Sequence, residues 1–179
     1  MNAVLTRPSP AWAKSLSAEL RESRDPHVVR RRRVVGLSLT AIGALGVVAL
    51  AQVGVLRRLP DPPLRFFASD TVTRSGSAYW MFGGPDAVVG IGSYAASALL
   101  ASIGGADRWR RHPWLPLLFA GKLALDAAGA ALLVREEVVT QRRACSWCLI
   151  ASAAAMLSFP QALPEAWAAG RQLLVRGRK

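Results

Sequence analysis

The apolar residues of this chain gather in four stretches, at about 34–56, 87–103, 114–134 and 145–163. The first stretch holds 23 residues, and Gln52 is the only strongly polar one among them. A helix rises ~1.5 Å per residue, so about 20 residues cross a hydrocarbon layer of ~30 Å. The pattern therefore predicts an all-α integral membrane protein, a four-helix bundle in which each stretch forms one helix.

The polar segments divide the chain into three parts. Residues 1–33 are expected to form a cytosolic N-terminal extension, residues 34–166 the membrane domain and residues 167–179 a basic cytosolic tail. The first apolar stretch begins too late for a cleaved signal peptide, whose apolar region follows a brief basic start. Residues 57–85 form a long outer loop between the first two helices, and loops of this length usually have a function.

The positive charge of the chain, formally +12, sets the expected orientation. With both termini inside, more than twice as many Lys and Arg residues lie in the inner segments as in the outer ones. Basic residues that flank membrane helices are retained on the cytoplasmic side. They explain the charge without nucleic acid, since no aromatic stacking motif accompanies them. We therefore expect membrane lipid and no nucleic acid as a partner.

Both cysteines of the chain, Cys145 and Cys148, stand at the outer end of the fourth stretch. In this orientation they face a compartment in which disulfides persist. Residues three apart share one face of a helix, so their sulfur atoms can pair. A helix N-terminus preceded by Arg142 and Arg143 favours a thiolate on Cys145. We interpret the pair as a redox dithiol.

Other uses of two cysteines fit the sequence less well. A zinc site needs further ligands, and the histidines, His27 and His112, fall on the opposite side of the membrane. Covalent haem attachment needs a histidine directly after Cys148, where Leu149 stands. Apolar filler remains the simplest alternative. We expect no metal, and the adjoining apolar stretch suggests a lipid-soluble electron acceptor such as a quinone.

Two opposite charges, Lys122 and Asp126, lie within the third apolar stretch. Their spacing of four residues places them on one helix face, where they can neutralise each other. Charged residues inside a membrane usually face the bundle interior. They either carry protons towards the outer side or form a structural pair, and the absence of further polar residues in line with them favours the structural pair.

The stretch Tyr79–Tyr94, YWMFGGPDAVVGIGSY, together with the CSWC motif at 145–148, resembles the vitamin K epoxide reductase family. The likeness covers about residues 34–166. It implies a four-helix membrane bundle around a quinone, menaquinone or ubiquinone. With the Ala- and Arg-rich composition, it also implies a bacterial inner membrane location.

The resemblance also implies roles for individual residues. Cys148 would lie next to the quinone ring, and Cys145 would exchange with a thiol donor. Asp86 stands where the family has a polar side chain that binds a quinone oxygen, although a helix N-cap is an equal alternative. Ser152 stands where some members have a tyrosine for the other oxygen, or it bonds back to its own helix. Apart from the resemblance, the position of Trp147 between the cysteines would let it cover the ring, although a place in the interfacial aromatic belt is the commoner explanation.

One departure from the family pattern concerns the outer loop. Members that form disulfides carry two loop cysteines, the second of them before an acidic residue. Here Ser69 precedes Asp70, and residues 57–85 contain no cysteine. Two functions remain open. The chain is a quinone-linked thiol-disulfide oxidoreductase in which a thioredoxin-like donor exchanges directly with Cys145, or it is a catalytically degenerate accessory subunit of a larger respiratory or photosynthetic membrane complex.

Overall fold

The computed structural model describes residues 10–64, 66–79 and 84–176 of the chain. These residues form helices and no β-strand, so the all-α prediction is confirmed. The helices are α1 (Ala11–Glu22), α2 (Pro26–Gln52), α3 (Ser69–Thr73), η1 (Gly76–Tyr79), α4 (Asp86–Ser102), α5 (Arg108–Arg111), α6 (Trp114–Arg135), the π-helical segment η3 (Glu136–Gln141) and α7 (Ser146–Arg176). Residues 80–83, part of the stretch that carries the family resemblance, lie outside the described residues.

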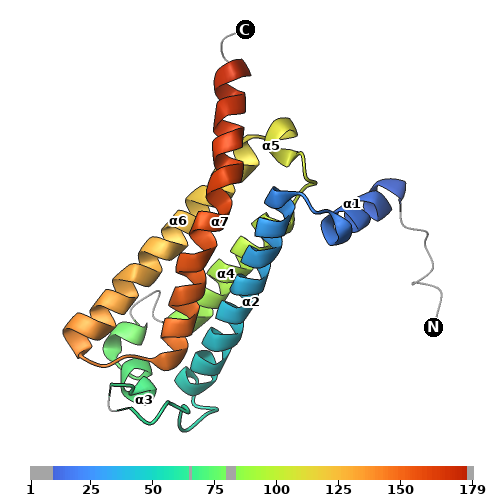
Figure 1. Ribbon diagram of the computed structural model, residues 1–179. Coiled ribbons are helices and arrows are strands. Elements are labelled where there is room, and N and C mark those ends of the chain that lie inside the picture. The colour runs from blue at the N-terminus through green and yellow to red at the C-terminus, as the bar shows by residue number, and fades with distance from the viewer. Residues whose placement is uncertain (1–9, 65, 80–83, 177–179) are drawn as a thin grey trace, which may run out of the picture.

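Helices α2, α4, α6 and α7 lie side by side and form the body of the molecule (Figure 1). Helix α1 stands off at one end of this body, and the short helix α3 lies at the other end (Figure 1). Each of α2 and α6 packs against both α4 and α7. The cysteine pair and the outer loop therefore lie at the end of the bundle that is far from α1.

Three helices are long and apolar enough to cross a membrane: α2, α6 continued by η3, and α7. Helix α4 is apolar as well but has only 17 residues. The first, third and fourth predicted stretches thus each contain a helix of sufficient length, although α2 ends at Gln52 and not at the predicted residue 56. That α4 crosses the membrane remains a prediction.

The helix ends differ from those that the apolar pattern predicts. Helix α2 begins at Pro26, ahead of its apolar residues, because the Asp25 side chain accepts hydrogen bonds from the backbone N–H groups of His27 and Val28 and caps the helix. Helix α7 continues to Arg176, past Pro160 and Pro164. Much of the segment expected as a basic tail is therefore helical.

The contact between α2 and α7 is made by small residues. Ala41 and Ala44 of α2 are buried against Ala151 and Ala154 of α7. Small side chains let two membrane helices approach closely, which is the usual basis of helix association in lipid. This close packing fixes the beginning of α7, and with it the cysteines, relative to α2.

The predicted pair of Lys122 and Asp126 is formed and is shared with α4. Lys122 Nζ lies 2.6 Å from Asp126 Oδ2 and 3.0 Å from Ser97 Oγ, and the hydroxyl of Ser97 donates to Asp126 at 2.6 Å. Ser93 makes equivalent contacts with both charged groups. Because the cluster joins α6 to α4 and its charges are paired, it supports the structural interpretation.

A second ion pair closes the end of the bundle that is near α1. Arg108 of α5 lies 2.8 Å from Glu165 of α7, and the two side chains are 1% and 2% exposed. Arg108 also donates to the carbonyl oxygens of Leu100 and Ile103. A buried ion pair is stable only when its remaining donors are satisfied, and these carbonyls satisfy them. The apolar pattern gave no sign of this pair.

Candidate redox site at the cysteine pair

The two cysteines lie at the start of α7 with their sulfur atoms 2.6 Å apart. Both are free thiols. Cys145 directly precedes the helix, and its Sγ accepts a hydrogen bond from the backbone N–H of Cys148 at 3.2 Å, as N-cap side chains do. A disulfide bond measures ~2.05 Å, so a small movement of either side chain would join the two sulfurs.

The two thiols face different surroundings. Cys145 is 0% exposed, and the outer loop covers it. Cys148 is partly exposed and lines a cavity between α2, α4 and η3. The pair therefore connects the loop, under which Cys145 is buried, with an internal cavity.

Asp61 fastens the outer loop over the cysteines. Its Oδ2 accepts the backbone N–H of Ser69 at 2.7 Å, and its Oδ1 accepts the hydroxyl of Ser146 at 2.7 Å. Ser69 Oγ in turn accepts the backbone N–H of Ser146 at 3.1 Å. Burial raises the pKa of Asp61, but the hydrogen bonds from Ser69 and Ser146 outweigh it and hold this pKa below its ordinary value.

Backbone contacts continue this attachment on either side. Ala68 N–H donates to Ala144 O, and Ala144 N–H donates to Phe66 O, each at 3.1 Å. The indole N–H of Trp147 donates to Pro60 O at 3.1 Å. The loop thus lies against the start of α7, which explains why Cys145 is fully buried.

The electrostatics of Cys145 agree in direction with the sequence prediction and share part of the predicted cause. A hydrogen bond from the Cys148 thiol lowers the pKa of Cys145, with a further contribution from the hydroxyl of Ser69, while burial acts against them. The predicted helix N-terminus contributes through the backbone N–H of Cys148, whereas Arg142 and Arg143 are not among the causes. The thiolate on Cys145 is stabilised by hydrogen bonds from within the site.

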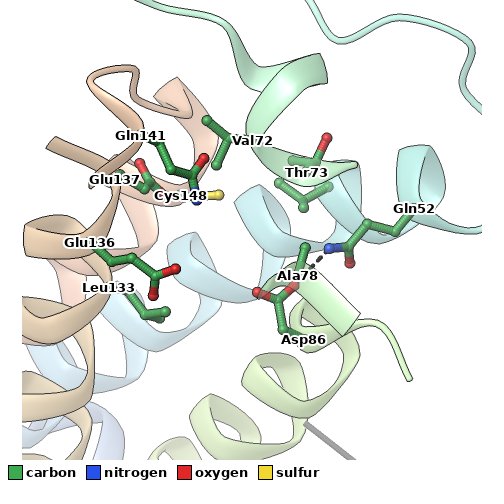
Figure 2. A pocket seen from close by; sticks show the side chains of 11 residues that line it. Gln52, Val72, Thr73, Ala78, Asp86, Leu133, Glu136, Glu137, Gln141 and Cys148 are labelled. Atoms are coloured by element: carbon green, nitrogen blue, oxygen red, sulfur yellow. Dashed lines mark hydrogen bonds between the residues drawn. The ribbon is translucent and has the colours of Figure 1, made fainter. Parts of the chain in front are cut away.

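Glu137 belongs to the site although the sequence placed it in a loop. Helix α6 continues as the π-helical segment η3, which ends at Gln141, and the next residue, Arg142, lies in the left-handed region at φ 50°. The Glu137 side chain is 7% exposed, and its Oε2 accepts the backbone N–H of Cys145 at 3.0 Å. Figure 2 shows this side chain beside Cys148, at the edge of the cavity that both residues line. The only sequence signal was a pair of glutamates between an apolar stretch and the cysteines.

The cavity beside Cys148 has a volume of about 50 Å³. Figure 2 shows the Cys148 sulfur on one side of it and the side chains of Gln52 and Asp86 on the other. The apolar part of the lining comes from Val48, Val72, Ala78 and Leu133, and the acidic part includes Glu136 and Glu137.

Gln52 and Asp86 form the polar wall of this cavity. Gln52 Nε2 donates to Asp86 Oδ1 at 2.7 Å, a bond that joins the end of α2 to the first residue of α4. The Oε1 atom of Gln52 is buried without a hydrogen-bond partner in the part of the chain that the structure describes. The wall therefore places polar side chains of α2 and α4 at the cavity, opposite Cys148.

The remaining predicted site residues lie close to the pair but outside the cavity lining. Ser152 is 6% exposed on α7, one turn after Cys148. The Trp147 ring packs against the apolar clusters formed by α2 and α7 and binds the loop through Pro60. Among the described residues, no group of three or more His, Cys, Asp and Glu side chains is arranged to hold a metal ion.

A model of the vitamin K epoxide reductase family matches residues 32–163 of the chain. The match includes most of α2, all of α4 and α6, and the cysteine pair. No curated protein and no solved structure matches the chain significantly.

Proposed function

Since the chain belongs to the vitamin K epoxide reductase family, we propose that it is a quinone-linked membrane thiol-disulfide oxidoreductase with Cys145 and Cys148 as its redox centre. One observation carries the proposal. The two thiols lie within 2.6 Å of each other, and only Cys148 faces a cavity with polar groups opposite it. The pair can therefore collect electrons on one side and release them on the other.

The membrane arrangement that goes with this function has four crossings and both termini in the cytoplasm. Helix α4 has 17 residues, which is at the lower limit for a membrane helix, and it packs against two of the longer helices. The cysteines then lie at the outer side of a bacterial inner membrane. There a disulfide persists, and a thioredoxin-like protein is the thiol donor that we propose.

The proposed reaction begins at Cys145. A thiolate of the donor attacks the Cys145–Cys148 disulfide and forms a mixed disulfide with Cys145, which a second donor thiolate resolves. The donor leaves as a disulfide, and the chain now holds two thiols. Their two electrons and two protons pass from Cys148 to a quinone, menaquinone or ubiquinone, and the Cys145–Cys148 bond forms again.

The residues around the cavity suit a quinone. A quinone supplies a lipid-soluble acceptor of two electrons and two protons. Gln52 Oε1, which is buried without a partner, would accept a hydrogen bond from the reduced ring, and Asp86 would hold the same side. The cavity of about 50 Å³ is smaller than a quinone ring, so the lining side chains must move apart to admit it. Ser152 and Trp147 stay predictions as further ligands.

A purified preparation tests this function directly. The full chain is reduced in detergent, freed of reductant and mixed with one equivalent of a short-chain quinone. We expect one quinol per chain and the loss of both free thiols, as measured by absorbance and by maleimide mass tagging. Cys148→Ser should form no quinol. Thiols that survive excess quinone would contradict the proposal.

The accessory-subunit function has one observation in its favour. Cys145 is 0% exposed under the loop, so a donor protein cannot reach it in this conformation. If the chain is an accessory subunit, it should copurify with a fixed set of membrane proteins in mild detergent. Its cysteines should then be dispensable for the activity of that complex.

A further inference from the structure

Among the residues that the structure describes, the exposed charges at the end of the bundle that holds the cysteines are all positive. At this end α3, the end of α6 and the start of α7 lie together (Figure 1). The exposed charged side chains there belong to Arg57, Arg58, Arg74, Arg135, Arg142 and Arg143. None of these six arginines takes part in an ion pair within the described part of the chain. This end therefore presents positive charge to its surroundings.

The carboxyl groups of the same end are used within the fold. Those in the described residues are all buried or partly buried: Asp61, Asp70, Asp86, Glu136 and Glu137. Asp70 accepts the backbone N–H of Leu59 at 3.1 Å, Asp61 holds the outer loop, and the other three line the cavity beside Cys148. The surface of this end thus keeps its positive charge.

Arg142 and Arg143 stand closest to the redox pair in the sequence. Arg142 lies in the left-handed region at φ 50°, where residues other than glycine are uncommon. Two residues later, Ala144 exchanges backbone hydrogen bonds with the outer loop. The turn therefore places both arginines beside the junction of the loop and α7, which must open before a donor reaches Cys145.

Neither topology nor the chemistry of the thiols accounts for these two arginines. Basic residues near membrane helices collect on the cytoplasmic side and are depleted on the other side, where the proposed arrangement places the cysteines. The sequence predicts that Arg142 and Arg143 stabilise a Cys145 thiolate, but they are not among the groups that lower its pKa. Their positive charge is therefore free to act on a partner.

We propose that the six arginines, with Arg142 and Arg143 nearest to the pair, form the docking surface for a thiol donor whose reactive cysteine is surrounded by acidic residues. Opposite charges on two approaching surfaces raise the association rate and orient the encounter. A donor thiolate attacks Cys145 of the disulfide, the Cys148 thiolate leaves, and a second donor thiol resolves the mixed disulfide. Two donor thiols become one disulfide, and the pair gains two electrons and two protons. The proposal rests on the function proposed above, whose donor it describes.

Two synthetic peptides of opposite charge test this surface. Each carries one cysteine, flanked by aspartates in one peptide and by lysines in the other, and all other residues are the same. The oxidised full chain in a non-ionic detergent is mixed with each peptide, and maleimide mass tagging gives the rate at which the cysteine pair is reduced. Each rate is divided by the rate of the same peptide with hydroxyethyl disulfide, a neutral compound, which cancels the difference in thiol reactivity. The ratio of the two normalised rates, acidic over basic, is the charge preference.

We expect wild type to show a charge preference of about ten in ~0.01 M salt, where the Debye length is ~30 Å. In ~1 M salt, where this length is ~3 Å, the charge preference should approach one. Arg142→Gln/Arg143→Gln should lower it roughly twofold to threefold in low salt, because two charges and those nearest to the pair are lost. Arg110→Gln/Arg111→Gln is the matched control, since it removes the same charge from α5 at the other end of the bundle, and it should keep the wild-type value.

The outcomes separate this inference from the proposed function. A wild type without charge preference in low salt overturns the inference, and so does an Arg142→Gln/Arg143→Gln variant that keeps the full preference. If phosphatidylglycerol then raises the Tm of wild type but not of this variant, the two arginines bind anionic lipid instead. In each case the chain can still reduce quinone, and the proposed function stands. A chain that prefers the acidic peptide but reduces no quinone overturns the proposed function alone. The salt dependence of wild type decides the matter if the variant does not fold.

Discussion

Ser146 donates a hydrogen bond to Asp61 at 2.7 Å, across 85 positions of the sequence. Ser146 lies between the two cysteines, and Asp61 belongs to the outer loop. The contact therefore joins the loop to the redox pair itself and keeps Cys145 out of contact with solvent. Exchange with a donor protein requires that this contact open.

Asp61→Ala should uncover Cys145. The substitution removes the carboxylate that binds Ser69 and Ser146, and hydrogen bonds to a charged group contribute about 1.5 kcal/mol or more each. We expect maleimide to label Cys145 of the reduced protein about tenfold faster or more, with labelling sites identified by mass spectrometry. Asp107→Ala, at the other end of the bundle, is the control. An unchanged rate would show that the loop is held by other contacts.

The same contact should weaken in acid. The pKa of Asp61 lies below its ordinary value in the folded protein. The carboxylate therefore stabilises the closed loop fully at a pH above the ordinary Asp pKa of about 3.9. This stabilisation is lost as the pH falls through the lowered pKa. We expect the labelling rate of Asp61→Ala to exceed that of wild type at pH 7 and the ratio to approach one in acid. Taking the ratio cancels the pH dependence of the reagent. A constant ratio would contradict the prediction.

The cluster around Lys122 should matter for stability and not for electron transfer. Asp126→Ala leaves an ammonium group without its partner inside the bundle, and breaking a buried pair costs about 3 kcal/mol. We expect a clearly lower Tm in detergent, recovered largely by Lys122→Met/Asp126→Leu. That double variant should still transfer electrons to quinone. A stable double variant without activity would show instead that the cluster carries protons.

Gln52→Leu should weaken quinone binding. The substitution removes the unpartnered Oε1 and the donor to Asp86 while keeping a similar volume. Loss of a hydrogen bond of about 1.4 kcal/mol weakens a binding constant tenfold. We therefore expect KM for quinone to rise about tenfold, while the reduction potential of the cysteine pair stays constant. Thr40→Val, on the exposed side of the same helix, should change neither. A wild-type KM in Gln52→Leu would remove this side chain from the quinone site.

The helices could be predicted because apolar periodicity is a local property, whereas the contacts of the site are not. The expected starts at 87 and 114 are within one residue of those observed, but α2 begins earlier because Asp25 and Pro26 form an N-terminal cap that hydropathy does not register. Glu137 falls between the third and fourth apolar stretches, and hydropathy does not register the hydrogen bond that joins it to Cys145 across a turn.

The cysteines, Asp86 and the charged pair were visible in the sequence because their residue types and spacing carry the signal. The Asp61 contacts were not visible in the sequence, because the sequence of a proline-rich loop does not indicate which residues of a distant helix it contacts. Gln52 was passed over for a similar reason. A single amide near a membrane boundary is common, and only the fold brings it within 2.7 Å of Asp86.

The redox state of Cys145 and Cys148 in native membranes tests the central claim most directly. Free thiols are trapped with a maleimide mass tag before and after quinone is extracted, and again after it is restored. We predict a largely oxidised pair in intact membranes, a reduced pair once quinone is removed, and oxidation on its return. A pair whose redox state does not respond to quinone would contradict the account.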